Sequence, residues 1–203
     1  MKKYLLLLFS FIFSIVTDID GNIYQTVQIG DQLWMAENLK VTHYNNEDTI
    51  TYITSEEPWG NMDKGQYGVY DDDPINANIY GNLYNWATIG DNRGICPEGW
   101  HVPSNDEFMV LINFLGGESV AGGKMKETGF EHWNYPNTGA TNESGFTGLG
   151  AGYREFNNGN YYSMSSIGFF WTSTENYIYN VWYRRLNRNL SDLYRYSFFK
   201  KAI

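Results

Sequence analysis

The residues best suited to chemistry lie in the segment CPEGWHVPSNDEF, residues 96–108. It contains the only cysteine of the 203-residue chain, Cys96, a short distance before His101, one of three histidines. A cysteine thiolate activated by an imidazole is a common enzyme nucleophile, but the same cysteine could be one half of a disulfide. Pro97 and Gly99 place a turn between the two side chains, and no oxyanion-hole pattern accompanies them. We therefore expect no catalytic residue and no enzyme.

Metal ligands are the second kind of chemistry to consider. The candidates form three groups: His43, His101 and His132; Asp18, Asp20 and Asn22; and Asp71, Asp72 and Asp73. The histidines lack the short spacing of zinc ligands. The second group opens like a calcium loop, but its glycine comes too early and no glutamate follows at the required distance. The third group precedes a proline, as solvated turns often do. We expect no metal site and no cofactor.

A helix is predicted directly after the Cys/His segment. Ser104 and Glu107 have the spacing of a capping box, and Gly116-Gly117 ends the helical pattern. One face of this helix is apolar, with Phe108, Leu111, Ile112 and Leu115 at helical spacing. A second, shorter helix is predicted over residues 120–127.

Strands and one further helix are predicted from periodicity. Residues 23–29 and 32–35 predict two strands of a hairpin that turns at Gly30-Asp31. Residues 177–184 alternate with period two, which predicts a strand. Apolar residues recur at helical spacing over residues 80–87, which predicts a short helix facing the core.

The N-terminus and the composition indicate an exported, single-domain protein. Residues 1–17 combine Lys2 and Lys3 with an apolar run too short to cross a bilayer comfortably, which predicts a signal peptide. One domain, residues 18–203, should follow, secreted or at the cell surface and without membrane insertion after signal removal. The formal net charge of −9 argues against a nucleic-acid partner. An aromatic content of 18% and 21 glycines favour short strands and turns.

Several segments, in this order, resemble the Fibrobacter succinogenes major paralogous domain, a secreted family common in Bacteroidetes and Fibrobacteres. They are DIDGNIYQTVQIGDQLWMAENLK, YGNLYNWAT, CPEGWHVPSNDEF, GGKMKETGFEHW, PNTGATNESGFTGLGAGYRE and FFWTSTE. The resemblance runs from Asp18 nearly to the end of the chain. It implies an α+β, C-type-lectin-like fold, with two helices beside a twisted, loop-rich antiparallel sheet. It implies no established activity.

The resemblance also bears on Cys96. Members of the family typically continue into a last strand whose second cysteine would pair with the one at Cys96, whereas this chain stops at FFKKAI. We therefore expect a truncated domain that lacks its last strand and exposes a neighbouring sheet edge. Cys96 is then a disulfide candidate whose partner is absent from the chain, and it could form an intermolecular disulfide in an oxidising compartment.

Function is expected on the loops, because in this fold they usually form the variable binding face. We expect a non-catalytic binding or adhesion module whose ligand is a glycan or a surface protein. The alternative is a structural component of a surface assembly with no soluble ligand, and nothing in the sequence favours the third option, an enzyme. The candidate ligand-binding residues are Trp133, Asn134, Tyr135, Asn137, Asn142, Tyr161, Tyr162 and Trp182.

Overall fold

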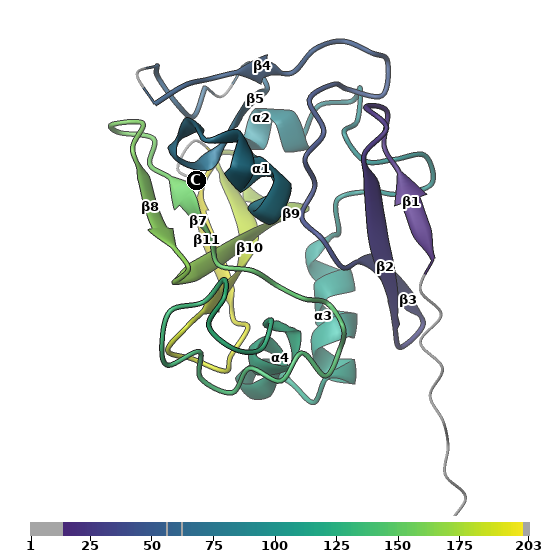
Figure 1. Ribbon diagram of the computed structural model, residues 1–203. Coiled ribbons are helices and arrows are strands. Elements are labelled where there is room, and N and C mark those ends of the chain that lie inside the picture. The colour runs from purple at the N-terminus through teal and green to yellow at the C-terminus, as the bar shows by residue number, and fades with distance from the viewer. Residues whose placement is uncertain (1–13, 56, 62, 201–203) are drawn as a thin grey trace, which may run out of the picture.

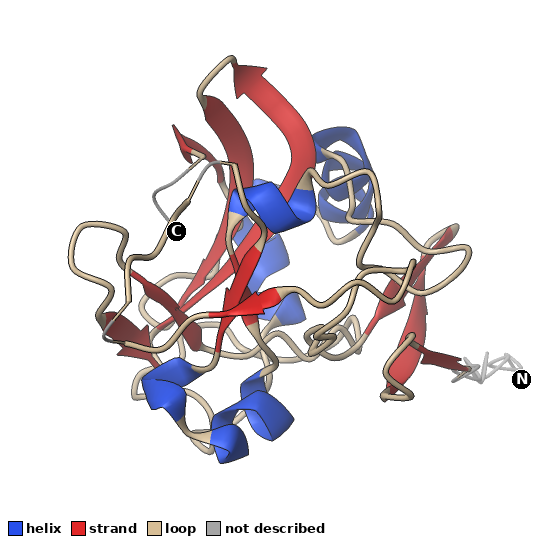
Figure 2. Ribbon diagram, turned by 90° about the horizontal axis from the view of Figure 1, so that it is seen from above, coloured by secondary structure: helices blue, strands red, loops and turns tan. Residues whose placement is uncertain are grey.

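The fold is mixed α/β, with few helices and several curled, mostly antiparallel sheets (Figure 1). The computed structural model describes residues 14–55, 57–61 and 63–200. Figure 2 shows that long loops join the short helices and strands.

The N-terminal part forms a small antiparallel sheet on one side of the molecule (Figure 1). Its strands are β1 (Ile15–Thr17), β2 (Ile23–Ile29) and β3 (Gln32–Met35). The predicted β2–β3 hairpin is confirmed, with Ile29 paired to Gln32 across the turn. Most of the predicted signal peptide, residues 1–13, lies outside the described residues. Its last three residues form β1, which pairs with β2.

The central part contains a second small sheet and three short helical segments. They are β4 (Thr51–Tyr52), β5 (Gln66–Gly68), η1 (Tyr70–Asp72), α1 (Pro74–Tyr80), β6 (Leu83–Tyr84) and α2 (Trp86–Ile89). The predicted continuous helix over residues 80–87 is therefore wrong. Gly81 ends α1 with a φ of 73°, and a Cβ there would lie 2.7 Å from the Cβ of Asn38. This close approach and left-handed backbone favour glycine and interrupt the helix.

The two longest helices contact each other, and the first of them lies beside the N-terminal hairpin (Figure 1). The first, α3 (Asn105–Phe114), has the predicted capping box between Ser104 and Glu107. The second, α4 (Glu118–Met125), begins two residues before the predicted position. Their apolar faces enter the main core, which includes Val27, Ile29, Trp34, Phe108, Leu111, Ile112, Leu115, Ala121, Met125, Trp133, Phe146, Leu186 and Leu193.

The largest sheet is formed by the C-terminal half. It has the order β11-β10-β9-β7-β8 and contains β7 (Ala151–Arg154), β8 (Tyr161–Met164), β9 (Ile167–Tyr177), β10 (Asn180–Asn187) and β11 (Arg195–Phe199). The predicted single strand over residues 177–184 is wrong, because the chain turns at residues 178–179 between β9 and β10. On its other side, β9 pairs with β7 at a single position, Gly152↔Gly168.

Candidate functional site

A pocket of about 530 Å³ lies beside β7 and β9. Its walls come from β3, β6, β7, β9 and the 95–103 segment, and most of its lining is apolar. Ligand sites are typically concave and apolar, with a few polar groups that orient the ligand. The aromatic residues of the lining are Trp34, Tyr80, Tyr84, Trp100, Phe108, Phe146, Tyr153, Phe169, Phe170 and Trp171.

Trp171 is the best-fixed ring of the β9 wall. Its indole Nε1 donates a hydrogen bond of 2.8 Å to the carbonyl oxygen of Tyr84 on β6. Its ring also meets that of Trp86 edge to face, at a centroid separation of 5.7 Å. Two residues further along β9, the amide of Ser173 donates to the carbonyl oxygen of Pro103 at 2.9 Å. The wall formed by β9 is thus attached to both β6 and the 95–103 segment.

Cys96 and His101 both line this pocket. Cys96 is a free, partly buried thiol, and burial raises its pKa to about 11, so it is protonated at neutral pH. The Nε2 atom of His101 lies 2.7 Å from Oε1 of Glu107. The other oxygen of that carboxylate accepts from the amide of Ser104 at 2.7 Å. The imidazole is therefore held by α3, and Cys96 is not an activated nucleophile.

The calcium-like aspartates bind protein donors. Asp18 accepts from the amide and side chain of Asn22, both at 2.9 Å, and from the hydroxyl of Tyr24 at 2.6 Å. Asp20 lies 2.6 Å from Nδ1 of His43. Within the part of the chain that the structure describes, no group of three or more His, Cys, Asp or Glu side chains is placed to hold a metal ion.

Two of the predicted ligand-binding residues are buried. Trp133 is 1% exposed in the main core, and its Nε1 donates to the carbonyl oxygen of Gly148 at 3.0 Å. Asn137 donates from Nδ2 to the carbonyl oxygens of Glu127 and Gly129, each at 2.9 Å. Both residues hold the loop of residues 127–142, called the 127–142 loop below, in place from inside.

Lys126 fixes the same region from the end of α4. Its side chain is fully buried, and Nζ donates to the carbonyl oxygens of Thr138, Asn187 and Leu190, each at 2.9 Å. Burial lowers its pKa to about 8, so the ammonium stays mostly charged at neutral pH. One cation thus joins the 127–142 loop to the end of β10 and the segment that follows it.

The remaining predicted residues are dispersed over the surface. Asn134 and Tyr135 are exposed on the 127–142 loop, whereas the Oδ1 of Asn142 accepts from the amide of Thr147 at 2.9 Å. The other three lie on strands. Tyr161 donates to Asp72 at 2.8 Å, Tyr162 is exposed on β8, and Trp182 packs against the Arg195 guanidinium at 4.1 Å. None of the eight residues is part of the pocket lining.

None of the aromatic residues that line the pocket is among the predicted ligand-binding residues. One sequence signal could have identified them. Phe169, Phe170 and Trp171 are consecutive, and successive side chains of a strand point to opposite faces. Aromatic rings therefore lie on both faces of β9, and each face of the strand has a large apolar side chain that packs against other residues or lines a pocket.

The arrangement defines a loop-rich mixed α/β domain with an aromatic pocket beside the interior strands β7 and β9 of its largest sheet. The Fibrobacter succinogenes major domain family matches residues 27–201, and the chain belongs to this family. The resemblance found in the sequence is thereby confirmed. No curated protein and no solved structure matches the chain. None of the helices in the described residues is long and apolar enough to span a membrane.

Proposed function

We propose that this domain is a secreted or cell-surface binding module without catalytic activity, and that its ligand, a glycan or part of a surface protein, occupies the pocket between β7 and β9. The observation that carries the proposal is the aromatic lining of this 530 Å³ pocket, in which five rings are partly exposed: Trp100, Tyr153, Phe169, Phe170 and Trp171. We also propose that the fold is C-type-lectin-like, because α3 and α4 lie beside a curled sheet with long loops (Figure 1).

The chemistry of the lining supports binding. Covering apolar surface contributes about 25 cal/mol per Å², so a ligand that fills an aromatic pocket gains affinity from burial alone. A few polar groups at the pocket could orient it. Gln32 donates from Nε2 to the carbonyl oxygen of Glu107 at 3.2 Å, and the Glu107 carboxylate pairs with His101. Fixed polar groups of this kind provide specificity.

The state of Cys96 supports the absence of catalysis. A cysteine nucleophile works as the thiolate and needs a depressed pKa or an adjacent base. The pKa of Cys96 is instead raised to about 11 by burial, and His101 is paired with Glu107.

A charge placed on the pocket wall tests the proposal. Leu33 lines the pocket and is 44% exposed, so Leu33→Asp should fold normally and weaken ligand retention roughly tenfold by placing a carboxylate against the bound ligand. Ile23→Asp is the matched control, because Ile23 belongs to the same hairpin, is 54% exposed and does not line the pocket. Retention would be measured on arrays of cell-wall polysaccharides and host surface proteins. Absence of saturable retention, or equal retention by both variants, would contradict the proposal.

The alternative of a structural role in a surface assembly is favoured by one observation. Exposed apolar side chains gather where the β9–β10 turn lies beside the end of β11, and they are Tyr177, Ile178, Tyr179, Phe198 and Phe199. Large exposed apolar patches often mark protein contacts. If this role is the correct one, Ile178→Asp should release the domain from isolated surface structures, and Leu33→Asp should not.

A further inference from the structure

Two aromatic rings lie on the surface of the 127–142 loop, outside the pocket lining. Phe130 is 63% exposed and Tyr135 is 77% exposed. Their ring centroids are 5.9 Å apart, and the two ring planes are tilted by 48° relative to each other. We call them the aromatic pair. Leaving two large rings exposed side by side forgoes hydrophobic stabilisation that a bound ligand would supply.

The backbone that carries the aromatic pair is fixed at several points. Asn137 bonds to the carbonyl oxygens of Glu127 and Gly129, which closes the segment before Phe130. The Nη1 atom of Arg188 donates to the carbonyl oxygen of Tyr135 at 2.9 Å. A ligand would therefore meet rings that are already positioned, and little conformational entropy would be lost on binding.

Neighbouring residues add to this rigidity. Trp133, which lies between Phe130 and Tyr135 in the sequence, is buried. The amide of Asn134 donates to the carbonyl oxygen of Ser165 at 2.6 Å. The amide of Thr138 donates to the carbonyl oxygen of Arg188 at 2.7 Å. The aromatic pair is thus exposed although the loop beneath it is firmly attached to the core.

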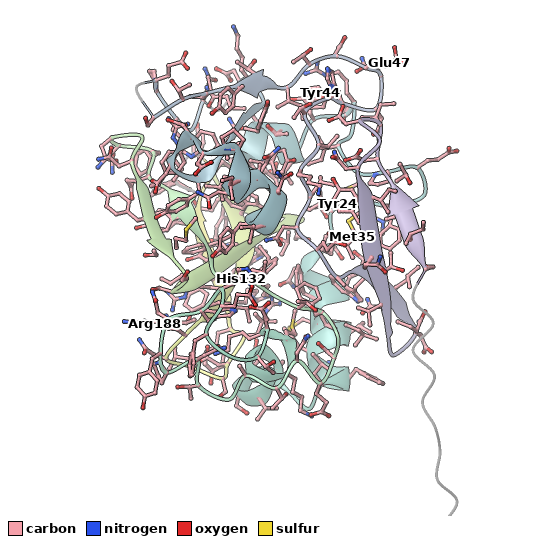
Figure 3. All side chains as sticks on the ribbon, viewed as in Figure 1. Tyr24, Met35, Tyr44, Glu47, His132 and Arg188 are labelled. Atoms are coloured by element: carbon pink, nitrogen blue, oxygen red, sulfur yellow. The ribbon has the colours of Figure 1, made fainter. Side chains whose placement is uncertain are left out.

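Polar groups beside the aromatic pair have unused hydrogen-bonding capacity. Among the described residues, the side-chain amide of Asn134 makes one hydrogen bond, a long one of 3.4 Å to Ser166. Toward the residues that the structure describes, the Arg188 guanidinium donates one hydrogen bond, through Nη1, and Figure 3 shows Arg188 at the edge of the molecule opposite the N-terminal hairpin. The exposed carboxylate of Glu131 lies in the same loop, so the surface combines both charge signs and favours a neutral ligand.

We propose that Phe130 and Tyr135, together with Asn134 and Arg188, form a second ligand site that binds a neutral glycan chain. A pyranose presents C–H groups on its face and hydroxyls on its edge. The aromatic pair matches the face, and the amide and guanidinium match the hydroxyls. Two rings are too few for the core of a specific protein interface, which involves about 20 to 30 residues a side. This site goes beyond the proposed pocket and does not depend on it.

Affinity electrophoresis tests the site. The intact domain would be run in native gels that contain dextran, mannan or hydroxyethylcellulose, three soluble neutral polysaccharides. We expect retardation by at least one of them and an affinity about tenfold weaker in the Phe130→Ala/Tyr135→Ala variant. Phe114→Ala is the matched control, because Phe114 is 64% exposed on α3 and should retain full affinity. The single variant Tyr135→Ala provides the same readout if the double variant does not fold.

Two outcomes would overturn the glycan site. One is mobility unaffected by all three polysaccharides. The other is equal affinity of the ring variants and the wild-type domain. If retardation instead depends on Leu33, which lines the pocket, the glycan binds in the pocket, so the second site is wrong and the proposed function stands. If the ring variants lose affinity while Leu33→Asp does not, the second site is supported independently of the pocket.

Discussion

The 127–142 loop and the pocket between β7 and β9 differ in how residue type relates to exposure. The loop contains the polar and aromatic residues that a binding surface often has, yet Trp133 and Asn137 are turned inward. The pocket contains residues typical of a core, yet they surround an open volume. Trp171 is the clearest of them, because its indole is fully bonded to the wall and its ring still lines the cavity.

The difference arises from the needs of the backbone. A long loop leaves carbonyl and amide groups without secondary-structure partners, so polar side chains are used inside it to satisfy them. Asn137 and Lys126 do so for five carbonyl oxygens between them. In a sheet, the backbone amide and carbonyl groups largely bond to neighbouring strands. Side chains on strands are therefore not needed as backbone partners, and apolar ones can line a pocket. Residue type therefore predicts a binding role less well than the secondary structure around it.

The largest expected effect is on Trp133. Trp133→Ala should lower the free energy of unfolding by about 4 kcal/mol, because it removes a fully buried indole from the main core. Tyr135→Ala, two residues away and exposed, should change it by less than about 0.5 kcal/mol. Urea denaturation monitored by tryptophan fluorescence and circular dichroism would measure both. A similar decrease in the free energy of unfolding for both variants would contradict the conclusion that Trp133 stabilises the loop from inside and Tyr135 does not.

The next effect is on Lys126. Lys126→Met should cost about 3 kcal/mol, because the carbonyl oxygens of Thr138, Asn187 and Leu190 would lose the charged donor that they share. Lys124→Met is the control, since that ammonium makes only a surface ion pair of 3.3 Å with Glu143 and should cost less than about 0.5 kcal/mol. The same denaturation assay applies. A stability loss confined to Lys124→Met would show that the loop is held in some other way.

A smaller effect separates two asparagines of the loop. Asn142→Ala should cost about 1 kcal/mol, because Asn142 has a positive φ of 47° and its Oδ1 accepts from the amide of Thr147. Asn134→Ala should be nearly neutral, because this side chain is exposed. Thermal melts of the two variants would measure this difference and so distinguish an asparagine that stabilises the loop from one that is exposed. The comparison fails if Asn134→Ala is the more destabilising change.

The last prediction concerns the reactivity of the Cys96 thiol and involves no change in stability. With its pKa raised to about 11 by burial, only about one thiol in ten thousand is a thiolate at pH 7. Labelling of the folded domain by a disulfide reagent should be slow at pH 7 and accelerate about tenfold per pH unit up to pH 10. Cys96 in the urea-unfolded chain, whose thiol is solvated, is the reference. Rapid labelling of the folded protein at pH 7 would mean that the pocket activates the thiol.

Patterns between sequence neighbours were predicted well. The capping box from Ser104 to Glu107 and the hairpin at Gly30-Asp31 depend on residues a few positions apart. The interrupted helix at Gly81 could not be predicted, because the cause is the approach of Asn38 from a distant part of the chain. The turn at residues 178–179 was hidden because exposed Ile178 and Tyr179 continue the alternation of the strands.

The candidate site was less accessible to sequence analysis for the same reason. The pocket joins residues from β3 to β9, and no local pattern relates Leu33 to Trp171. Its lining is brought together from segments far apart in the sequence, which is a property of the assembled fold. By contrast, Tyr135, one of the candidate ligand-binding residues, is 77% exposed on its loop.

Because of Lys126, the order of the 127–142 loop does not depend on a bound metal ion. Many loop-rich extracellular domains rely on calcium to bring backbone oxygens together, and they lose that order when the ion is removed. Here an ammonium group that is covalently part of the chain binds three backbone oxygens, one from the 127–142 loop and two from the end of β10 and the residues after it. This cation cannot be chelated or diluted away. The loop surface that carries Tyr135 should therefore keep its shape in calcium-poor media and in the presence of EDTA.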